Sequence, residues 1–303
     1  MADPIIEARG LRKSYPGVDA LAGLNLTVPR GAICGLLGRN GAGKTTTIKV
    51  LLGMVRPTAG TASVFGLAAD NEHASVEIRR RAAFVSEDRD LYDAMSVGQL
   101  VRFTRRFYPQ WNRDLEREYL ARFELPETRG VKALSRGMRT KLALLLALAS
   151  NAELLILDEP TAGLDPVSNE EVLQLLVAHV ARTGLTVLLS THQLTEVDQI
   201  ADHIAIVDRG RTILSGALDD VRARYRRVQI VFEGEAPAHA FAAPGVVATR
   251  RAGRVLTVLV SDGAERVAAE ARALGAKAVD VLPVTLKEIF LENVAGEAAH
   301  ALV

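Results

Sequence analysis

Short apolar runs separated by glycine, proline and asparagine dominate the first 65 residues of the chain, and this pattern predicts β-strands. The predicted strands cover residues 5–9, 24–28, 32–37 and 61–65. A single helix is expected between the third and fourth strands, beginning at about Gly43 and ending near Gly53. We therefore expect an N-terminal region that is mainly β-structure with one helix inserted in it.

The pattern changes to a helical period farther along the chain. Apolar residues recur at helical spacing after a capping-box sequence that begins at Ser96, and they do so again after Pro109. A third helix is expected from about residue 137 to residue 149. The three segments together predict a helical insertion over about 88–150.

Residues 153–216 return to an alternation of strands and helices. The predicted strands are 154–157, 186–190 and 204–207, and the predicted helices are near 167–182 and 193–201. These strands are apolar along their whole length, which is typical of strands buried on both faces. Their alternation with helices favours a parallel sheet.

The last part of the chain predicts a second, smaller domain. A basic run at 221–227 is expected to be a solvated helix end or a linker. Beyond it, the order strand, short helix, two strands, helix, strand and helix predicts a small α+β domain of βαββαβ type over 226–303, which carries nine basic and nine acidic side chains. We expect a main domain over 1–218, a linker over 219–225 and this accessory or regulatory domain.

The composition is that of an ordinary globular protein, because 49% of the 303 residues are hydrophobic and 24% are charged. The net charge is +1, so no overall field attracts nucleic acid. Cys34 is the single cysteine, which excludes a disulfide framework and a cysteine-based zinc site. No secretory signal is visible, and the longest apolar run, 142–149, is far shorter than the ~20 residues of a membrane span. We expect a soluble, cytoplasmic chain whose membrane role, if any, depends on a partner.

The clearest chemical motif lies at residues 38–45, which match G-x-x-x-x-G-K-[ST] between an apolar strand and a predicted helix. The glycines let backbone N–H groups point inward at an anion, and the helix N-terminus adds partial positive charge. The lysine would contact β and γ phosphates, and the hydroxyl after it can bind Mg²⁺. The residues expected to surround the phosphates are Gly38, Arg39, Asn40, Gly41, Ala42, Gly43, Lys44, Thr45 and Thr46.

A second motif is the apolar strand 154–157, which ends in two carboxylates, Asp158 and Glu159. Asp158 is placed to hold Mg²⁺, directly or through water, together with Thr45. Glu159 is then a candidate to polarise the attacking water. On its own such a strand end could be a solvated acidic turn, but the phosphate loop favours the catalytic interpretation.

A third motif identifies a family. Residues Leu134, Ser135, Arg136, Gly137 and Met138 open a predicted helix and resemble LSGGQ, the signature of ABC transporter ATP-binding subunits. The resemblance covers roughly 5–217 and implies a P-loop ABC ATPase fold with an antiparallel β subdomain. Arg136 and Met138 depart from the signature, whereas Ser135 and Gly137 keep it. In the family these residues meet the γ-phosphate of ATP held by the other subunit.

Four more positions match motifs of the same family. Asp165 lies in a sequence similar to the D-loop, which crosses the interface of the ATPase dimer. His192 follows a strand and resembles the switch histidine, and Tyr15 matches the aromatic residue that stacks on adenine. Glu87 stands where the family usually has a glutamine that joins its two lobes. A carboxylate there can still bind Mg²⁺ or a water, but it adds a negative charge and loses the amide donors.

Within the family the chain resembles the bacterial type-2, exporter-like branch. The resemblance implies Lys44, Glu159 and His192 as catalytic residues, with ATP and Mg²⁺ as cofactors. It also implies a homodimer or heterodimer of ATPase subunits on the inner face of the cell membrane, bound to a separate integral membrane permease, and no nucleic acid. Two alternatives stay open at this point: a soluble ABC ATPase that acts on ribosomes or DNA, and a nucleotide-dependent regulator that does not hydrolyse ATP.

Overall fold

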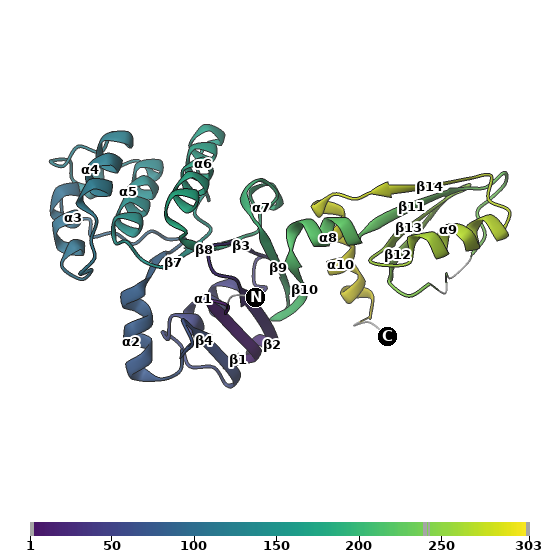
Figure 1. Cartoon of the computed structure of the whole chain (residues 1–303), viewed down its shortest axis with the longest axis horizontal. Coiled ribbons are helices and arrows are strands. Elements are labelled where there is room, and N and C mark those ends of the chain that lie inside the picture. Colours follow the sequence, from purple (N-terminus) through teal and green to yellow (C-terminus); the bar gives the residue numbers. More distant parts are fainter. Residues whose placement is uncertain (1–2, 239–240, 242, 301–303) are drawn as a thin grey trace. The chain divides into compact units, whose positions relative to one another are not determined.

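The computed structural model describes residues 3–238, 241 and 243–300 (Figure 1). The chain divides into two compact units, residues 1–215 and residues 216–303. Each unit is described by itself below. In the described residues, no helix is both long enough and apolar enough to cross a membrane.

A six-stranded sheet forms the centre of the first unit. Its order is β10 (Arg211–Ala217), β9 (His203–Asp208), β3 (Ile33–Leu37), β8 (Thr186–Thr191), β7 (Leu154–Asp158) and β6 (Ala82–Val85). The strands from β9 to β6 run parallel, as the alternating pattern predicts. The predicted strands of this sheet are confirmed, and β6 and β10 are additional to them.

The sheet is apolar along its strands because a separate core covers each face. Along β7, Leu155 and Leu157 pack into a core built with the helices of the insertion, and Leu154 and Ile156 pack into a core built with the N-terminal β-structure. Successive side chains of a strand point to opposite faces, so a strand between two cores needs apolar residues at every position.

The N-terminal β-structure is an antiparallel sheet in the order β2 (Val18–Val28), β1 (Ile6–Tyr15), β4 (Ala59–Val64) and β5 (Leu67–Ala68). Helix α1 (Lys44–Leu51) follows β3, as predicted, and packs its apolar residues into the same core. Helix α2 (Glu72–Arg81), which the pattern does not predict, begins after Asn71. The Asn71 side chain accepts a hydrogen bond from the Ala74 N–H at 3.0 Å and so caps this helix.

Three helices form the predicted insertion: α3 (Val97–Arg105), α4 (Arg113–Arg122) and α5 (Arg136–Ala149). The capping box at Ser96 is present, and Gln99 completes it. The Asn112 side chain caps α4, and its N–H donates to the Ala149 carbonyl at 2.7 Å, which fixes the start of α4 at the end of α5. Helices α6 (Pro166–Thr183) and α7 (Leu194–Ile200) complete the first unit close to their predicted positions.

The second unit contains an antiparallel sheet in the order β12 (Val246–Ala252), β13 (Val255–Val260), β11 (Arg226–Val231) and β14 (Ala278–Pro283). Helices α8 (Leu218–Arg224), α9 (Ala264–Ala273) and α10 (Leu286–His300) accompany it. The α+β class is as predicted. The segment expected as a linker, 219–225, lies mostly in α8, and the basic run continues into β11.

The short helix predicted between the first two strands of this domain is wrong for the described residues there, which form bends, turns and irregular chain. Residues 239, 240 and 242 of this segment lie outside the described part. Phe232, Ala236 and Phe241 are buried in the core of the unit. Burial of these side chains, with prolines and glycines between them, competes successfully against a helix whose only local support is its alanine content.

Candidate functional site

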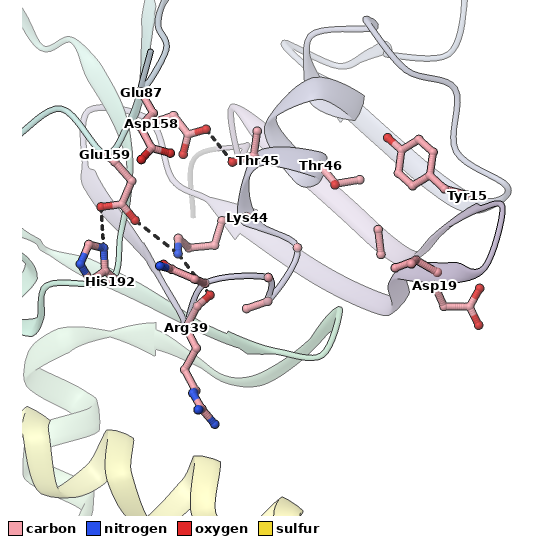
Figure 2. A pocket seen from close by; sticks show the side chains of 16 residues that line it. Tyr15, Asp19, Arg39, Lys44, Thr45, Thr46, Glu87, Asp158, Glu159 and His192 are labelled. Atoms are coloured by element: carbon pink, nitrogen blue, oxygen red, sulfur yellow. Dashed lines mark hydrogen bonds and ion pairs between the residues drawn. The ribbon is translucent and has the colours of Figure 1, made fainter. Parts of the chain in front are cut away.

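The predicted phosphate loop, the ends of two parallel strands and the end of β1 surround one pocket of about 560 Å³ (Figure 2). Most of the predicted site residues line it. They are Tyr15, the loop residues Arg39 to Thr46, Glu87, Asp158, Glu159 and His192, with Val18, Asp19 and Ala20 beside them. The carboxyl ends of parallel strands meet at one edge of a sheet, which explains why segments far apart in the sequence converge here.

The shape of the loop between β3 and α1 depends on its glycines. Gly41 and Gly43 have φ angles of 80° and 104°, in the region that favours glycine. A Cβ at Gly43 would lie 2.6 Å from the Ala20 carbonyl oxygen, and one at Gly38 would lie 2.4 Å from that of Val207. The loop therefore keeps its backbone free to face a ligand at the N-terminus of α1, where N–H groups are available for phosphate oxygens.

Lys44 is a buried cation at the bottom of this loop. Its ammonium donates to the Gly38 carbonyl at 2.8 Å and lies 3.3 Å from Glu159 Oε1. The second contact is an ion pair without hydrogen-bond geometry, since Glu159 Oε1 has no hydrogen-bond partner. Lys44 thus joins the phosphate loop to the end of β7 through charge.

Asp158 and Thr45 form a set of oxygen atoms suited to a hard cation. The Thr45 hydroxyl donates to Asp158 Oδ2 at 2.8 Å, and the Ser190 hydroxyl donates to Asp158 Oδ1 at 2.7 Å. The described residues contain no cluster of three or more His, Cys, Asp or Glu that could hold a metal alone. Mg²⁺ fits such a sparse site, because it is usually bound by one or two protein oxygens with phosphates and waters completing its shell.

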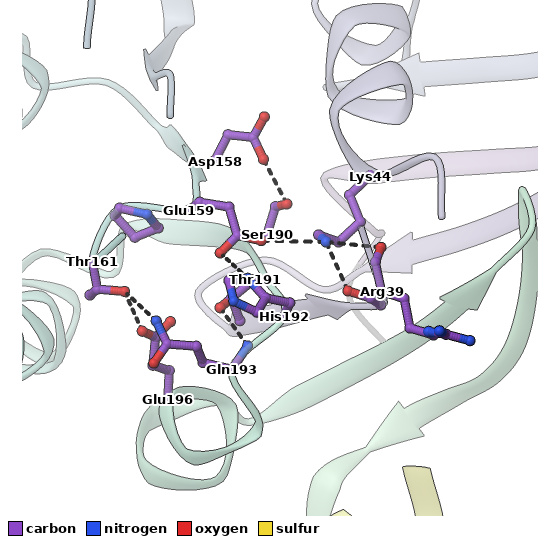
Figure 3. A network of polar contacts seen from close by, with 12 residues as sticks. Arg39, Lys44, Asp158, Glu159, Thr161, Ser190, Thr191, His192, Gln193 and Glu196 are labelled. Atoms are coloured by element: carbon purple, nitrogen blue, oxygen red, sulfur yellow. Dashed lines mark hydrogen bonds and ion pairs between the residues drawn. The ribbon is translucent and has the colours of Figure 1, made fainter. Parts of the chain in front are cut away.

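Glu159 is held in an uncommon conformation for a residue that is not glycine, with φ at 48°. Its N–H donates to the Ser190 carbonyl at 2.9 Å, and its Oε2 lies 2.9 Å from His192 Nδ1 (Figures 2 and 3). The carboxylate is buried, while about half of the His192 side chain is exposed. Two cationic or donor groups therefore flank one buried carboxylate at the bottom of the pocket.

The signature and D-loop residues do not line this pocket. Ser135 precedes α5, where its hydroxyl accepts a hydrogen bond from the Met138 N–H at 3.2 Å. Asp165 caps α6, and hydrogen bonds from Ser168 are the largest of the contacts that lower the pKa of its carboxyl group. Arg136 lies against Gly163, where an added Cβ would meet its guanidinium carbon at 2.4 Å.

The structure also adds buried polar residues that the sequence does not single out, among them Ser190, Arg89 and Glu196. Glu196 accepts a hydrogen bond from the Thr161 hydroxyl, and burial is the main cause that raises the pKa of its carboxyl group (Figure 3). Its position four residues after His192, one helical turn on, is the only local signal for it.

A parallel sheet with a phosphate loop and an acidic strand end defines a P-loop nucleotide-binding protein. Comparison with known proteins narrows this class. The ABC transporter family model matches residues 21–162. The ABC transporter ATP-binding protein YtrB of Bacillus subtilis is 31% identical over 97% of this chain and 99% of its own length. The chain therefore belongs to the family of ABC transporter ATP-binding proteins.

Two further matches agree with this membership. The daunorubicin/doxorubicin resistance ATP-binding protein DrrA of Streptomyces peucetius is 40% identical over 72% of this chain and 67% of its own length. The structure of CbiO1 from Clostridium perfringens, part of the ABC transporter complex cbiONQ, superposes with a TM-score of 0.63 at 29% identity, covering 73% of this chain and 92% of that chain. The predicted family, fold class and ATPase activity with ATP and Mg²⁺ are confirmed.

Proposed function

We propose that two ATPase subunits of this type close around two ATP molecules and drive a separate membrane permease, with export as the direction of transport. The observation that carries the proposal is the division of the site residues. The phosphate loop, Asp158, Glu159 and His192 share one pocket, whereas Ser135 and Asp165 lie outside it. Two half-sites from two chains would complete each ATP site, with Ser135, Arg136, Gly137 and Met138 supplied by the opposite subunit.

Within one chain, the proposed roles follow from chemistry and position. The loop backbone and Lys44 would bind the phosphates, and the Tyr15 ring would stack on the adenine. Thr45 and Asp158 would hold Mg²⁺, with Glu87 near enough to the pocket to contribute through water. The bound Mg²⁺ neutralises charge on the β and γ phosphates. Glu159 would orient and polarise the attacking water, and His192 would hold the carboxylate in place from its other side.

A protein partner is supported by an exposed aromatic row on the helical insertion. Tyr92 and Phe107 are 60% and 61% exposed, and Phe103 lies between them with edge-to-face contacts at 5.5 and 5.1 Å. Aromatic residues gathered on a surface are typical of interface anchors. We assign this row to the permease, and thereby the chain to the inner face of the membrane as a peripheral subunit. The name of DrrA favours export, and that of CbiO1 favours a multi-subunit complex.

The test is ATP-dependent dimerisation measured by light scattering. The Glu159→Gln variant should bind ATP and double its mass when ATP is added, because hydrolysis no longer dissolves the dimer. The double variant Glu159→Gln with Ser135→Arg should stay monomeric with ATP, since a bulky cation would block the opposite half-site. Normal dimerisation of the double variant would show that the signature does not act across two chains.

Mixing two inactive variants then separates a homodimer from a heterodimer. Lys44→Ala damages the phosphate loop, and Ser135→Arg damages the signature. In a homodimer, the mixture forms some dimers with one intact composite site and regains ATPase activity. If the mixture stays as inactive as its components while each variant is folded, the chain needs a different ATPase subunit as its partner.

A further inference from the structure

Arg89 is a buried arginine that joins two parts of the first unit. It follows β6 and lies two residues after Glu87. Only 4% of it is exposed. Its guanidinium donates to the Glu159 carbonyl at 3.2 Å, to the Pro160 carbonyl at 2.7 Å and to the Ala162 carbonyl at 3.3 Å. One side chain therefore binds three carbonyls of the turn that follows β7.

This arrangement is unfavourable for Arg89 taken alone. Its backbone has φ at 49°, which is uncommon for a residue other than glycine, and its Nε has no hydrogen-bond partner. Burial and the nearby charge of Arg136 lower the pKa of its guanidinium, and Glu87 opposes this effect. Strain and desolvation held together at one residue next to a reaction site indicate a role beyond packing.

The Glu159 backbone is fixed from two directions through this contact. Its N–H donates to the Ser190 carbonyl at 2.9 Å, and its C=O accepts from Arg89 at 3.2 Å. A peptide held at both ends determines where the side chain between them points. The carboxylate is thereby directed toward Lys44 and His192, 3.3 and 2.9 Å away.

We propose that Arg89 is a positioning residue for the ATPase reaction, which holds the turn 159–162 so that the Glu159 carboxylate faces the attacking water. The inference rests on the proposed role of Glu159. Because Arg89 belongs to the same loop as Glu87, a displacement of this loop moves the Glu159 backbone directly. Lysine cannot replace it fully, since an ammonium on a flexible chain does not reproduce the planar fork that reaches three carbonyls.

Steady-state ATPase kinetics of Arg89→Met and Arg89→Lys test the proposal. We expect kcat to fall between about 10-fold and 100-fold in Arg89→Met, because a small displacement of a catalytic group has effects of this size. The KM for ATP should stay within about threefold, because the phosphate loop is untouched. Arg89→Lys should retain more activity than Arg89→Met. Guanidinium chloride at low millimolar concentration should restore part of kcat in Arg89→Ala by filling the vacated space.

Arg79→Met is the matched control, since the Arg79 guanidinium also donates to a backbone carbonyl, that of Leu52 at 2.8 Å, from a half-buried position. It should lower thermal stability without a selective loss of kcat. An equal loss of kcat in both variants, with no guanidinium rescue, would make Arg89 a structural brace only and overturn the proposal.

Glu159→Gln separates the two levels of the argument. Normal kcat in Arg89→Met together with an inactive Glu159→Gln would overturn the positioning role and leave the proposed function intact. An active Glu159→Gln would instead remove the proposed role of Glu159. If Arg89→Met fails to fold, Arg89→Lys and the guanidinium response of Arg89→Ala still decide the question, since a brace without a positioning role predicts unchanged kcat in the lysine variant.

Discussion

Glu159 concentrates the chemistry of this ATPase in one buried carboxylate, which two neighbours of opposite function contact. Lys44 balances its charge, and His192 shares its other oxygen. The Glu159→Gln substitution keeps the size of the side chain and removes its basicity. We expect turnover to fall by about 10²-fold or more, the usual contribution of a general base. ATP affinity should change little, because Asp158 and the loop are intact.

The measurement is single-turnover hydrolysis beside equilibrium ATP binding. Glu118→Gln serves as a control, because Glu118 is an exposed carboxylate whose partner is Arg182 on another helix. It should leave both quantities unchanged. Hydrolysis by Glu159→Gln within about threefold of the unmodified protein, under ~0.7 kcal/mol of barrier, would exclude Glu159 as the main base.

Glu196 offers a pH-dependent test of a buried group. Burial raises the pKa of its carboxyl group above the ordinary 4.5, so the folded state binds a proton that the unfolded state releases above that pH. The stability that this group contributes is present below pH 4.5 and is lost as the pH rises through the folded pKa. Glu196→Gln removes this loss and keeps an acceptor for Thr161. Its unfolding midpoint should therefore match the unmodified protein near pH 4.5 and exceed it increasingly toward neutral pH. A constant difference across the pH range would contradict the assignment.

The predicted site residues share one property, namely that each lies in a contiguous motif. The phosphate loop and the pair Asp158 and Glu159 could be recognised because their spacing alone implies a strand, a turn and an anion site. Arg89 and Ser190 could not, since their contacts depend on which strands become neighbours. Ser190 reaches Asp158 because β8 lies beside β7 in the sheet, a relation that no local pattern encodes.

At the scale of elements, buried segments were predictable and polar ones were not. Helix α5 and strand β7 carry strong apolar patterns and appear as predicted. Helix α2 escapes prediction because it buries only Ser75 and Ile78 and is otherwise polar, so no apolar face marks it. Strand β1 extends beyond its predicted end because it pairs with both β2 and β4, and this pairing supports residues that are too polar to suggest a strand.

The aromatic row on the insertion provides the prediction at this scale. Replacing Tyr92 and Phe107 by serine should abolish copurification of the permease from solubilised membranes, because each interface aromatic contributes about 2 kcal/mol or more. ATP hydrolysis by the isolated chain should persist, since the row is separate from the pocket. Val177→Ser is the control, as Val177 is an exposed apolar residue on α6. Equal permease recovery with the aromatic variant and the control would place the contact elsewhere.

At the scale of the whole molecule, the second unit is the part whose role the ATPase motifs do not explain. It has its own core, built around Val228, Val258 and Val267. Strand β14 lies at one edge of its sheet, and Val281 on this strand is 37% exposed. An unpaired edge can accept another strand. Antiparallel pairing of β14 with its copy in a second chain is self-complementary, as a twofold dimer requires.

We therefore expect the second unit to raise the affinity of the ATPase dimer. A chain cut after Arg224 keeps every strand of the six-stranded sheet, so it should still bind ATP. Its ATPase activity should reach half of its maximum at a protein concentration at least about tenfold higher, equivalent to 1.4 kcal/mol of dimer affinity. Val281→Lys in the full chain should shift the curve in the same direction, because a charge at an edge strand opposes pairing. Lys287→Ala, a change outside β14, is the control and should leave the curve in place. Superimposable activity curves for the cut and full chains would leave the second unit without a part in dimerisation.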